Sequence, residues 1–320
     1  MINGESFSEG ASHKPRVALI AGPTASGKSD LAVKLALQLR AEGRTAVVIN
    51  ADSAQVYADL RVLSARPSEE EMQGVAHVLF GAWDGAQGCS AADWANAAKA
   101  EIAAAHARSA VPILVGGTGM YINTLLHGIA PVPEIDPAIR ADVRALPVDK
   151  AYAALVDEDP ARAALLGPAD VQRVTRALEV VRSTGQSLAH WQQQRVGGIG
   201  DMVDLAPIIL LPERQWLYQR CDLRFELMWQ GGAVAEVEAL LSRSLPDSLP
   251  VMRAIGVPEI AAFLRGEMTR EQAIAKGQQA TRNYAKRQYT WLKNQNPDDW
   301  PRLTYENSID FSLTASLLRT

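Results

Sequence analysis

The chain has 320 residues, of which 48% are hydrophobic and 21% charged, and its formal net charge is −4. This length allows one large domain or two modest ones, and the composition is that of an ordinary globular protein. The acidic balance excludes a uniformly basic nucleic-acid binder, although local basic strips remain compatible with it because phosphate affinity depends on where the charges lie.

The number and spacing of the cysteines and histidines indicate the cellular compartment and whether a zinc site is expected. The two cysteines are far apart, and neither they nor the five histidines form a zinc-ligand spacing. We therefore expect a reducing, cytoplasmic setting. Residues 1–14 are polar and lack an apolar core, so we expect a flexible N-terminal tail rather than a signal peptide or anchor. No apolar run reaches about 18 residues, so no membrane span is expected.

The stretch 17–29 has the order strand, glycine loop and helix. Residues 17–20 are a short apolar run typical of a buried parallel strand, and the leucines after Lys28 recur at helical spacing. Gly22 and Gly27 frame the loop and allow backbone N–H groups to turn inward, toward the point where the helix N-terminus also aims. This order predicts a phosphate-binding loop.

Two side chains add to that loop. Lys28 supplies a mobile positive charge, and the Ser29 hydroxyl is placed to hold Mg²⁺. The alternative is a plain glycine turn with a surface lysine, and the loop alone does not name a reaction. The predicted diphosphate- or nucleotide-binding residues are Gly22, Pro23, Thr24, Ala25, Ser26, Gly27, Lys28 and Ser29.

A second strand is predicted at residues 45–49, and it runs into Asp52 and Ser53. The carboxyl ends of the strands form the ligand crevice of a doubly wound sheet, so Asp52 is expected near the phosphate loop. The alternative is that Asp52 or Ser53 caps the next helix, and spacing alone does not decide between the two.

A third strand is predicted at residues 111–115, where Pro112 suggests an edge or strand-start position. The glycines that follow at 116–119 are expected to let the backbone approach a ligand, beside the Thr118 hydroxyl. An ordinary P-loop ATPase would commonly place a magnesium-holding aspartate at the end of such a strand. Glycine stands there instead, and this counts against an ATPase.

Residues 132–204 predict an all-helical insertion, because Asp136-Pro137 and Asp159-Pro160 are helix starts and no strand pattern appears. Residues 171–181 have an amphipathic pattern, with Arg173 and Arg176 on the polar side. By spacing alone, a helix face exposed to solvent explains these two arginines equally well. The residues expected to face inward are Val171, Val174, Leu178 and Val181.

Residues 205–211 indicate a return to the sheet, and a helix with Arg220 and Arg224 one turn apart follows. Two guanidinium groups on one face can grip phosphate oxygens, although ion pairs with Asp222 or Glu226 are an alternative.

A last predicted helix, at 281–293, interleaves cations with aromatic residues. No acidic residue lies between Glu271 and Asp298. This pattern suggests a surface that faces RNA.

Together these segments resemble the bacterial type of tRNA dimethylallyltransferase, the isopentenyl transferases that modify the adenosine next to the anticodon. The departures are mild: His77 is single where the family has a pair, Arg66 replaces a lysine before Pro67, and Pro258 follows Val257. The matching segments are Gly22-Pro-Thr-Ala-Ser-Gly-Lys-Ser29, Asp52-Ser-Ala-Gln55, Gly116-Gly-Thr-Gly-Met-Tyr121, Gln172-Arg-Val-Thr-Arg176, Met252-Arg-Ala-Ile-Gly256 and Arg282-Asn-Tyr-Ala-Lys-Arg-Gln288.

The resemblance implies an α/β fold in which a P-loop parallel sheet core is flanked by helices and carries an all-helical insertion domain. The catalytic core would be residues 15–131 and 205–300. The insertion, 132–204, would contact the tRNA anticodon stem-loop, and 301–320 would form a C-terminal tail. We expect a monomer.

The implied reaction transfers a dimethylallyl group from dimethylallyl diphosphate to N6 of the adenosine 3′ of the anticodon and releases diphosphate, with Mg²⁺ as cofactor. Two rivals remain: a P-loop small-molecule kinase with a helical lid, and a non-catalytic RNA-binding protein with a nucleotide switch. The residues that the resemblance assigns to catalysis are Asp52, which accepts the proton, Thr118, Lys28 and Arg220. Those that it assigns to tRNA are Asp52, Ser53, Ala54, Gln55, Thr118, Arg140, Gln172, Arg173, Val174, Thr175, Arg176, Arg282, Lys286 and Arg287.

Overall fold

The computed structural model describes residues 14–304, and these fall into two compact units. The first unit is made from the described parts of Met1–Leu125 and Gly200–Thr320, and the second is Leu126–Ile199. The helical unit thus begins and ends a few residues before the expected limits of 132 and 204. Within residues 14–304, no helix is long and apolar enough to cross a membrane.

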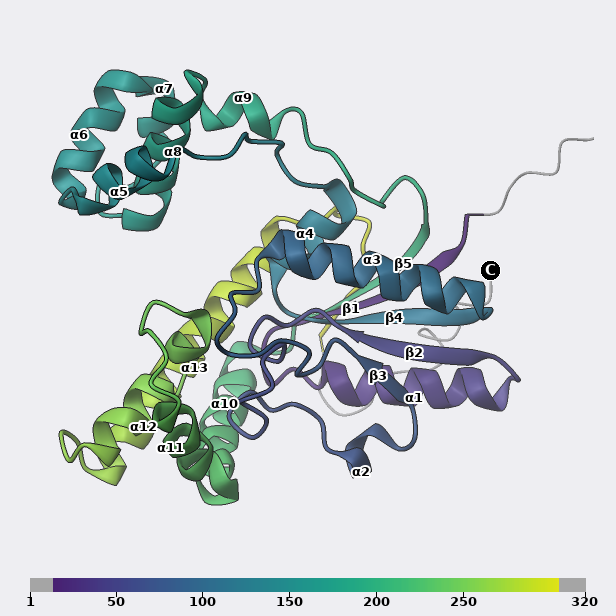
Figure 1. Cartoon of the computed structure of the whole chain (residues 1–320). Helices are drawn as coiled ribbons and strands as arrows, with labels where there is room; N and C mark the ends of the chain where they lie inside the picture. The colour runs from purple at the N-terminus through teal and green to yellow at the C-terminus, as the bar shows by residue number, and fades with distance from the viewer. Residues whose placement is uncertain (1–13, 305–320) are drawn as a thin grey trace, which may run out of the picture. The chain divides into compact units, whose positions relative to one another are not determined.

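The first unit is built on a sheet of six strands in the order β3-β2-β4-β1-β5-β6, and every neighbouring pair is parallel. Helix α1 (Lys28–Ala41) and helix α3 (Ala91–Ala107) cover opposite faces of this sheet (Figure 1). Two further helices in the N-terminal part of the chain are α2 (Glu69–Met72) and α4 (Gly119–His127). The strands are β1 (Arg16–Ala21), β2 (Thr45–Asn50), β3 (Ala76–Val78), β4 (Ala110–Gly116), β5 (Asp204–Leu210) and β6 (Arg302–Leu303).

Burial explains why the central strands are apolar on both sides. Leu19, Ile20 and Ile113 are at most 1% exposed, as expected for parallel strands covered by helices on both faces. The apolar stripe of α1, which includes Leu31 and Leu35, packs into one core cluster with Ile20 and Ile113. The sequence predictions at 17–20, 45–49 and 111–115 are confirmed by β1, β2 and β4.

The edges of the sheet differ from expectation. Strands β3 and β6 were not predicted, because two or three residues are too few for a sequence pattern. Arg302 and Leu303 pair with Ile209 and Leu210, so residues 301–304 do not belong to the expected C-terminal tail. The rest of that tail and residues 1–13 lie outside the described residues.

Of the two positions expected for Pro112, the edge of the sheet is wrong, while a position near the start of its strand agrees with β4, which begins at Ala110. Strand β4 lies between β2 and β1, and Pro112 is aligned with Val47 of β2. The paired register with β1 starts one residue later, at Ala18 and Ile113. The proline is therefore tolerated in a central strand because it precedes the ladder on that side.

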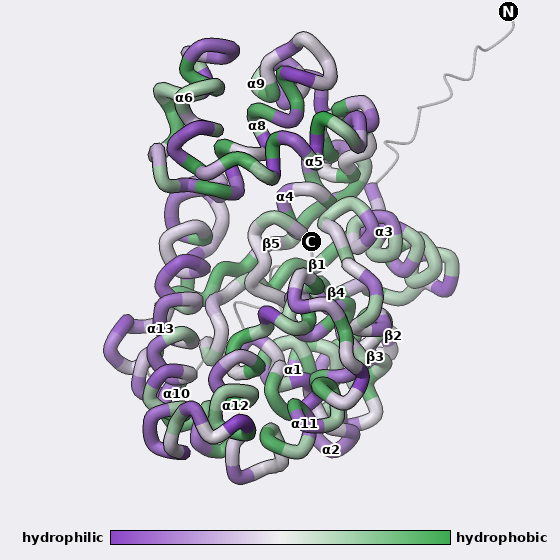
Figure 2. The backbone as a smooth tube through the Cα atoms, turned by 60° about the vertical axis from the view of Figure 1, so that its left-hand side comes forward, coloured by the Kyte–Doolittle hydropathy of each residue, from purple (hydrophilic) through white to green (hydrophobic). Residues whose placement is uncertain are grey.

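The chain after β5 is mainly helical, and its helices gather beyond the carboxyl ends of the strands (Figure 1). Helices α10 and α13 pack so closely that a Cβ atom on Gly277 would lie 2.0 Å from the Phe225 ring. Figure 2 shows the central strands as mostly hydrophobic and α13 as mostly hydrophilic. The elements are α10 (Arg214–Met228), a π-helical turn (Trp229–Ala233), α11 (Val234–Ser242), a 3₁₀ turn (Pro250–Arg253), α12 (Val257–Leu264) and α13 (Arg270–Asn294).

The second unit is a small helical bundle with its own core, which includes Leu155, Val174 and Leu178. The expected helix starts at Asp136 and Asp159 are confirmed, since both side chains accept hydrogen bonds from backbone N–H groups of the helices that they begin. Its helices are α5 (Pro137–Ala145), α6 (Val148–Glu158), α7 (Pro160–Ala163), α8 (Val171–Thr184) and α9 (Leu188–Gln192).

The inward face of α8 was predicted only in part. Val174 and Leu178 are completely buried, but Val171 is 58% exposed. Val171 is the first residue of the helix, and the core does not extend to that turn. Glu179 is buried instead, where it pairs with Arg144 of α5 at 2.8 Å.

Candidate functional site

A cavity of about 350 Å³ lies in the first unit, at the carboxyl ends of the strands. Its walls come from the phosphate loop, the segment after β2, α10 and α13, which are far apart in the sequence. Lysine, arginine and aspartate side chains line it together with leucine, phenylalanine and methionine. The cavity can therefore hold a ligand with one anionic and one apolar end.

The phosphate loop joins β1 to α1, as predicted. Gly27 is the N-cap of α1 and has φ of 86°, a conformation that favours glycine. The N–H of Gly22 donates to the Gly116 carbonyl at 3.1 Å, which fixes the loop to the end of β4. The Ser26 hydroxyl is buried and has no hydrogen-bond partner among residues 14–304.

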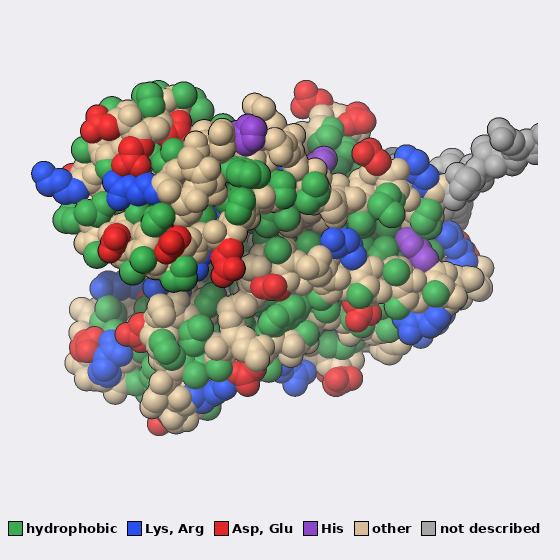
Figure 3. Space-filling view, turned by 45° about the horizontal axis from the view of Figure 1, so that its top comes forward, with side chains coloured by type: hydrophobic (Ala, Val, Ile, Leu, Met, Phe, Trp, Pro, Cys, Tyr) green, Lys and Arg blue, Asp and Glu red, His purple; other side chains and the backbone are tan. Residues whose placement is uncertain are grey.

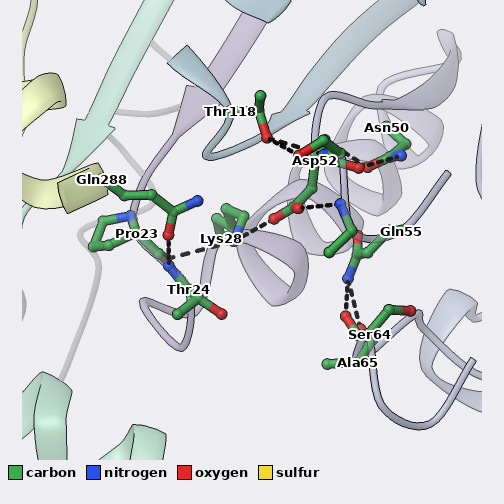
Figure 4. A network of polar contacts seen from close by, with 12 residues as sticks. Pro23, Thr24, Lys28, Asn50, Asp52, Gln55, Ser64, Ala65, Thr118 and Gln288 are labelled. Atoms are coloured by element: carbon green, nitrogen blue, oxygen red, sulfur yellow. Dashed lines mark hydrogen bonds and ion pairs between the residues drawn. The ribbon is translucent and has the colours of Figure 1, made fainter. Parts of the chain in front are cut away.

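Lys28 and Asp52 meet inside the cavity, as Figure 4 shows. The Lys28 ammonium donates to the Pro23 carbonyl at 3.4 Å and lies 3.9 Å from the Asp52 carboxylate. Burial lowers the pKa of Lys28 from its ordinary value of 10.5, while the neighbouring Asp52 charge opposes this shift. The prediction that Asp52 lies near the phosphate loop is confirmed.

A turn positions Asp52, and no helix does. The Asp52 carboxylate accepts a hydrogen bond from the Ala54 N–H at 3.0 Å, and the Asp52 N–H donates to the Asn50 side chain at 2.9 Å. Asn50, which is buried, also donates to the Asp52 and Leu79 carbonyls at 3.0 and 3.1 Å. The next helix begins at Glu69 and is capped by Ser68, so the capping alternative is wrong.

Thr118 lies next to this turn. Its hydroxyl accepts a hydrogen bond from the Ser53 N–H at 2.9 Å and donates to the Ser53 hydroxyl at 3.2 Å. The Tyr284 hydroxyl, which comes from α13, also hydrogen-bonds with Thr118 and Ser53. Burial, followed by the Asp52 charge, raises the pKa of Tyr284, so this phenol stays protonated beside the carboxylate.

The glycines at the end of β4 and just after it are each packed against another segment of the chain. A Cβ atom would lie 2.1 Å from the Ala51 carbonyl oxygen at Gly116, 2.5 Å from the Gly22 carbonyl oxygen at Gly117 and 2.3 Å from the Trp291 ring at Gly119. The expectation that they let the backbone approach a ligand stays a prediction, and none of the three lines the cavity. They admit three other segments of the chain, which brings Thr118 to the site.

Two arginines of α10 reach the phosphate loop. Arg220 donates to the Ala25 carbonyl at 3.0 Å, and Arg224 hydrogen-bonds with the Thr24 hydroxyl and lines the cavity. Asp222 is hydrogen-bonded to Arg282, so the alternative in which Asp222 pairs with these arginines is wrong. Arg224 has the better position for a ligand, although only Arg220 was assigned to catalysis. Its spacing of one helical turn from Arg220 was the available signal.

Helix α13 contributes from the other side. The Gln288 side chain accepts a hydrogen bond from the Thr24 N–H at 2.8 Å, and its own buried nitrogen has no partner within the described residues. Arg287 lines the cavity, with its guanidinium 5.8 Å from the Tyr284 ring centre, and Lys286 is exposed. Arg282, by contrast, is held by Asp222. Gln288 closes a matched sequence motif but was not assigned a role.

The remaining residues assigned to tRNA divide by exposure. Arg173 is exposed and lies 3.5 Å from Asp170, and Arg176 is partly exposed, 3.7 Å from Glu179. Val174 has no exposed surface, so its assignment to RNA contact is wrong. The Gln55 amide nitrogen donates to the Ser64 and Ala65 carbonyls at 3.1 and 2.7 Å, which makes it part of the cavity wall. Gln172 is exposed, Thr175 is partly exposed and Arg140 has a buried Nε atom.

Charge on the molecular surface is mixed. On the face drawn in Figure 3, lysine and arginine side chains are interspersed with aspartate and glutamate. Within the cavity, Lys28 and Arg224 supply positive charge. The fold and this cavity together define a P-loop protein whose cavity places a buried cation, Lys28, next to a carboxylate, Asp52.

Comparison with known proteins identifies the family. Residues 55–295 match the family model described as IPP transferase. The chain is 76% identical over 277 residues to a tRNA dimethylallyltransferase of Novosphingobium aromaticivorans, covering 87% of this chain and 99% of that protein. It is 68% identical over 300 residues to a tRNA dimethylallyltransferase of Erythrobacter litoralis, covering 94% of each.

Solved structures agree. A tRNA isopentenylpyrophosphate transferase from Bacillus halodurans matches with a TM-score of 0.67 and 32% identity, covering 95% of this chain and 94% of that one. A eukaryotic dimethylallyltransferase acting on tRNA matches with a TM-score of 0.78 and 27% identity, covering 94% and 77%. The chain belongs to the IPP transferase family, as its sequence motifs indicate.

Proposed function

We propose that the chain transfers the dimethylallyl group of dimethylallyl diphosphate to N6 of the adenosine 3′ of the anticodon in tRNAs, in the cytoplasm. The observation that carries this proposal is the position of Lys28 and Asp52 in one cavity, 3.9 Å apart. The reaction needs a cation that binds the leaving diphosphate, and Lys28 can serve as that cation. It also needs a base that takes a proton from the attacking amine, and the Asp52 carboxylate can serve as that base.

The phosphate loop holds the diphosphate as a leaving group. Lys28, Arg224 and the N-terminus of α1 converge on the same end of the cavity, where they stabilise the negative charge that develops as the C–O bond breaks. Arg220 acts indirectly, because its guanidinium holds the Ala25 carbonyl of the loop.

Mg²⁺ fits this site as a partner of the diphosphate. Ser29 stands in the first turn of α1 and lines the cavity. Within residues 14–304 no three His, Cys, Asp or Glu side chains are arranged to hold a metal ion. A single hydroxyl ligand suits Mg²⁺, which commonly takes one or two protein ligands and completes its shell with phosphate oxygens and water. The bound ion would add positive charge next to the leaving group.

In the proposed transfer step, one bond forms, one bond breaks and one proton is transferred. The exocyclic nitrogen of adenosine attacks the first carbon of the dimethylallyl group, a new N–C bond forms, and the C–O bond to diphosphate breaks. The nitrogen loses one proton, which Asp52 accepts. Thr118 and Tyr284 place hydroxyl groups beside the Asp52 turn, where they can orient the Asp52 carboxylate that acts as the general base.

RNA reaches the cavity from the side of α13. The adenosine must leave the anticodon-loop stack to enter, since its amine is otherwise inaccessible. Exposed Lys286, together with Arg287 at the cavity, can contact the RNA backbone there. In the helical unit, Arg173 and Arg176 are the partly or fully exposed cations of the matched motif. A monomeric state stays a prediction.

The kinase alternative lacks support. Strand β4 ends at Gly116, where an ordinary P-loop ATPase commonly carries an aspartate for its metal. Membership of the IPP transferase family favours prenyl transfer as well.

Mass spectrometry of an anticodon stem-loop RNA tests the proposal. The RNA is incubated with the protein, dimethylallyl diphosphate and Mg²⁺, and nuclease digestion should yield one adenosine that carries a dimethylallyl group. The Asp52→Asn variant serves as the matched control. A phosphorylated small molecule formed from ATP, with no prenylated RNA, would establish the kinase instead. Binding of RNA without any product would leave the nucleotide-switch protein.

A further inference from the structure

One wall of the cavity is a loop with no regular secondary structure. This wall loop, residues 60–65, contributes Leu60, Leu63, Ser64 and Ala65 to the cavity lining. Leu60 is fully buried and Leu63 is 8% exposed, so the loop presents apolar surface inward. Phe225 and Met228 of α10 line the same cavity. These apolar side chains suit the hydrocarbon part of a prenyl diphosphate, the donor in the proposed function.

Loops of this kind are mobile unless something fixes their backbone. From the side of Asp52, Gln55 holds the wall loop through the Ser64 and Ala65 carbonyls. Leu63 also packs against the start of α12, where a Cβ atom on Gly256 would lie 2.5 Å from its side chain.

A single carboxylate holds the other end. Glu236 of α11 accepts hydrogen bonds from three consecutive backbone N–H groups: Arg61 at 2.6 Å, Val62 at 2.8 Å and Leu63 at 2.9 Å. Consecutive N–H groups that point to one side form an anion-binding concavity, and charge-assisted bonds of this type are the stronger ones. The segments that meet here are more than 170 positions apart in the chain.

A second ionic contact from the same helix lies next to the first. Arg243, at the end of α11, bonds to Asp59, directly before the wall loop, and to Asp84 at 2.6 Å. Helix α11 follows α10 through the turn Trp229–Ala233, where the non-helical backbone of Gly232, with φ of 108°, makes a kink. Two consecutive helices thus contact the two loops, α10 the phosphate loop through Arg224 and α11 the wall loop through Glu236.

We propose that Glu236 is a positioning residue for the proposed prenyl transfer. Its carboxylate fixes the wall loop and thereby determines how closely the cavity fits the five-carbon donor. Glu236 does not line the cavity itself, so it acts only through the backbone of Arg61, Val62 and Leu63. The substrate named in this inference rests on the proposed function, but the claim that Glu236 fixes the wall loop does not.

The first test measures the contact without any activity. Hydrogen exchange read by mass spectrometry should show the amides of residues 61–63 protected in the wild-type protein. In Glu236→Gln, which keeps the size but replaces one acceptor oxygen with a donor, these amides should exchange at least about tenfold faster. Glu238→Gln is the matched control, because Glu238 is exposed on the same helix and the substitution makes the same charge change. Unprotected wild-type amides would overturn the proposal.

The second test measures selectivity. The ratio of kcat/KM for dimethylallyl diphosphate to kcat/KM for geranyl diphosphate should fall about tenfold in Glu236→Gln, since fit to a hydrocarbon chain discriminates by about 10–200-fold per methylene. The affinity for inorganic diphosphate, which needs only the phosphate loop, should stay within about twofold. An unchanged ratio in a folded Glu236→Gln protein, or an equal fall in Glu238→Gln, would overturn the proposal.

A folding defect can be separated from the proposed role. Glu236→Asp keeps the charge and shortens the side chain, so it should recover part of the protection and part of the selectivity. If wild-type protein prenylates no RNA, the proposed function fails, while the exchange experiment still decides whether Glu236 holds the wall loop.

Discussion

The Lys28 ammonium lies 3.9 Å from the Asp52 carboxylate, and both side chains are less than a tenth exposed. Each charge lowers the cost of burying the other, but the distance exceeds that of a direct hydrogen bond. The two charges therefore stabilise each other without sharing a hydrogen bond, which leaves each group free to bond to a different part of a substrate. A diphosphate would bind at the lysine and leave the carboxylate facing the nucleophile.

We predict that Asp52→Asn slows the chemical step. The amide keeps the size of the side chain and can still accept the Ala54 N–H, but it cannot take a proton from the adenine amine. General-base assistance contributes about 10²–10⁴-fold, so single-turnover rates should fall in that range while tRNA and diphosphate affinities change only a few-fold. Asp30→Asn, an exposed position on α1, is the control. A near-normal rate in Asp52→Asn would mean that the proton leaves to water or to the diphosphate.

Lys28 predicts a pH dependence of donor binding. Burial lowers its pKa below the ordinary 10.5. Dimethylallyl diphosphate binds the charged ammonium, so affinity should be greatest below the lowered pKa of Lys28 and decrease as the pH rises through it. Calorimetry between about pH 7 and 10 should show this loss begin at a pH below that of an ordinary lysine. Lys28→Met should bind weakly with no such step, and Lys34→Met should behave as wild type. A step that persists in Lys28→Met would assign it to another group.

Ser29 predicts how activity responds to magnesium. The Ser29 hydroxyl is the one protein ligand that we propose for the ion, since it lines the cavity at the first turn of α1. Ser29→Ala should therefore raise the Mg²⁺ concentration for half-maximal activity by about tenfold or more, and added chelator should abolish activity of both proteins. Ser248→Ala is the control, because Ser248 is exposed and does not line the cavity. Equal magnesium dependence of Ser29→Ala and wild type would remove Ser29 from the metal site.

We predict a salt effect on RNA binding from Lys286, an exposed cation of α13. If Lys286 contacts one phosphate, Lys286→Ala should weaken tRNA binding and reduce the slope of log K against log salt by about 0.7–0.9. Arg287 has a mixed role, because it lines the cavity and lies over Tyr284. Its removal should lower kcat as well as affinity. Lys276→Ala, at an exposed position nearer the start of the same helix, should leave the slope unchanged. An unchanged slope in Lys286→Ala would place Lys286 away from the RNA.

We predict that a larger side chain at position 116 lowers the stability of the fold. A methyl group there would lie 2.1 Å from the Ala51 carbonyl oxygen, in a central part of the sheet where the backbone has little room to move. Gly116→Ala should reduce the free energy of unfolding by about 1–3 kcal/mol or more, as overpacking does. Gly88→Ala, with nothing within 4 Å of the added atom, should stay within about 0.5 kcal/mol. Urea denaturation measures both, and equal stability of the two variants would contradict the packing argument.

The sequence by itself determined the phosphate loop and the strand that precedes it. These features depend on local spacing, in which an apolar run, two glycines and a helical repeat follow one another within about 25 residues. It also placed Asp52 just after the carboxyl end of a strand, where parallel strands meet at one edge of the sheet, but it left open whether Asp52 faces the phosphate loop or caps a helix. The family motifs and the helical insertion followed from the same kind of local pattern.

Only the tertiary structure decided which distant segments meet. Thr24 and Gln288 are 264 positions apart, and Val62 and Glu236 are 174 apart, so no periodicity connects them. The partners of Gly116, Gly117 and Gly119 are likewise backbone and side chains from other segments, and the sequence suggested a ligand in their place. A residue type states which contacts it can make, but the packing of the whole chain determines which of them it does make.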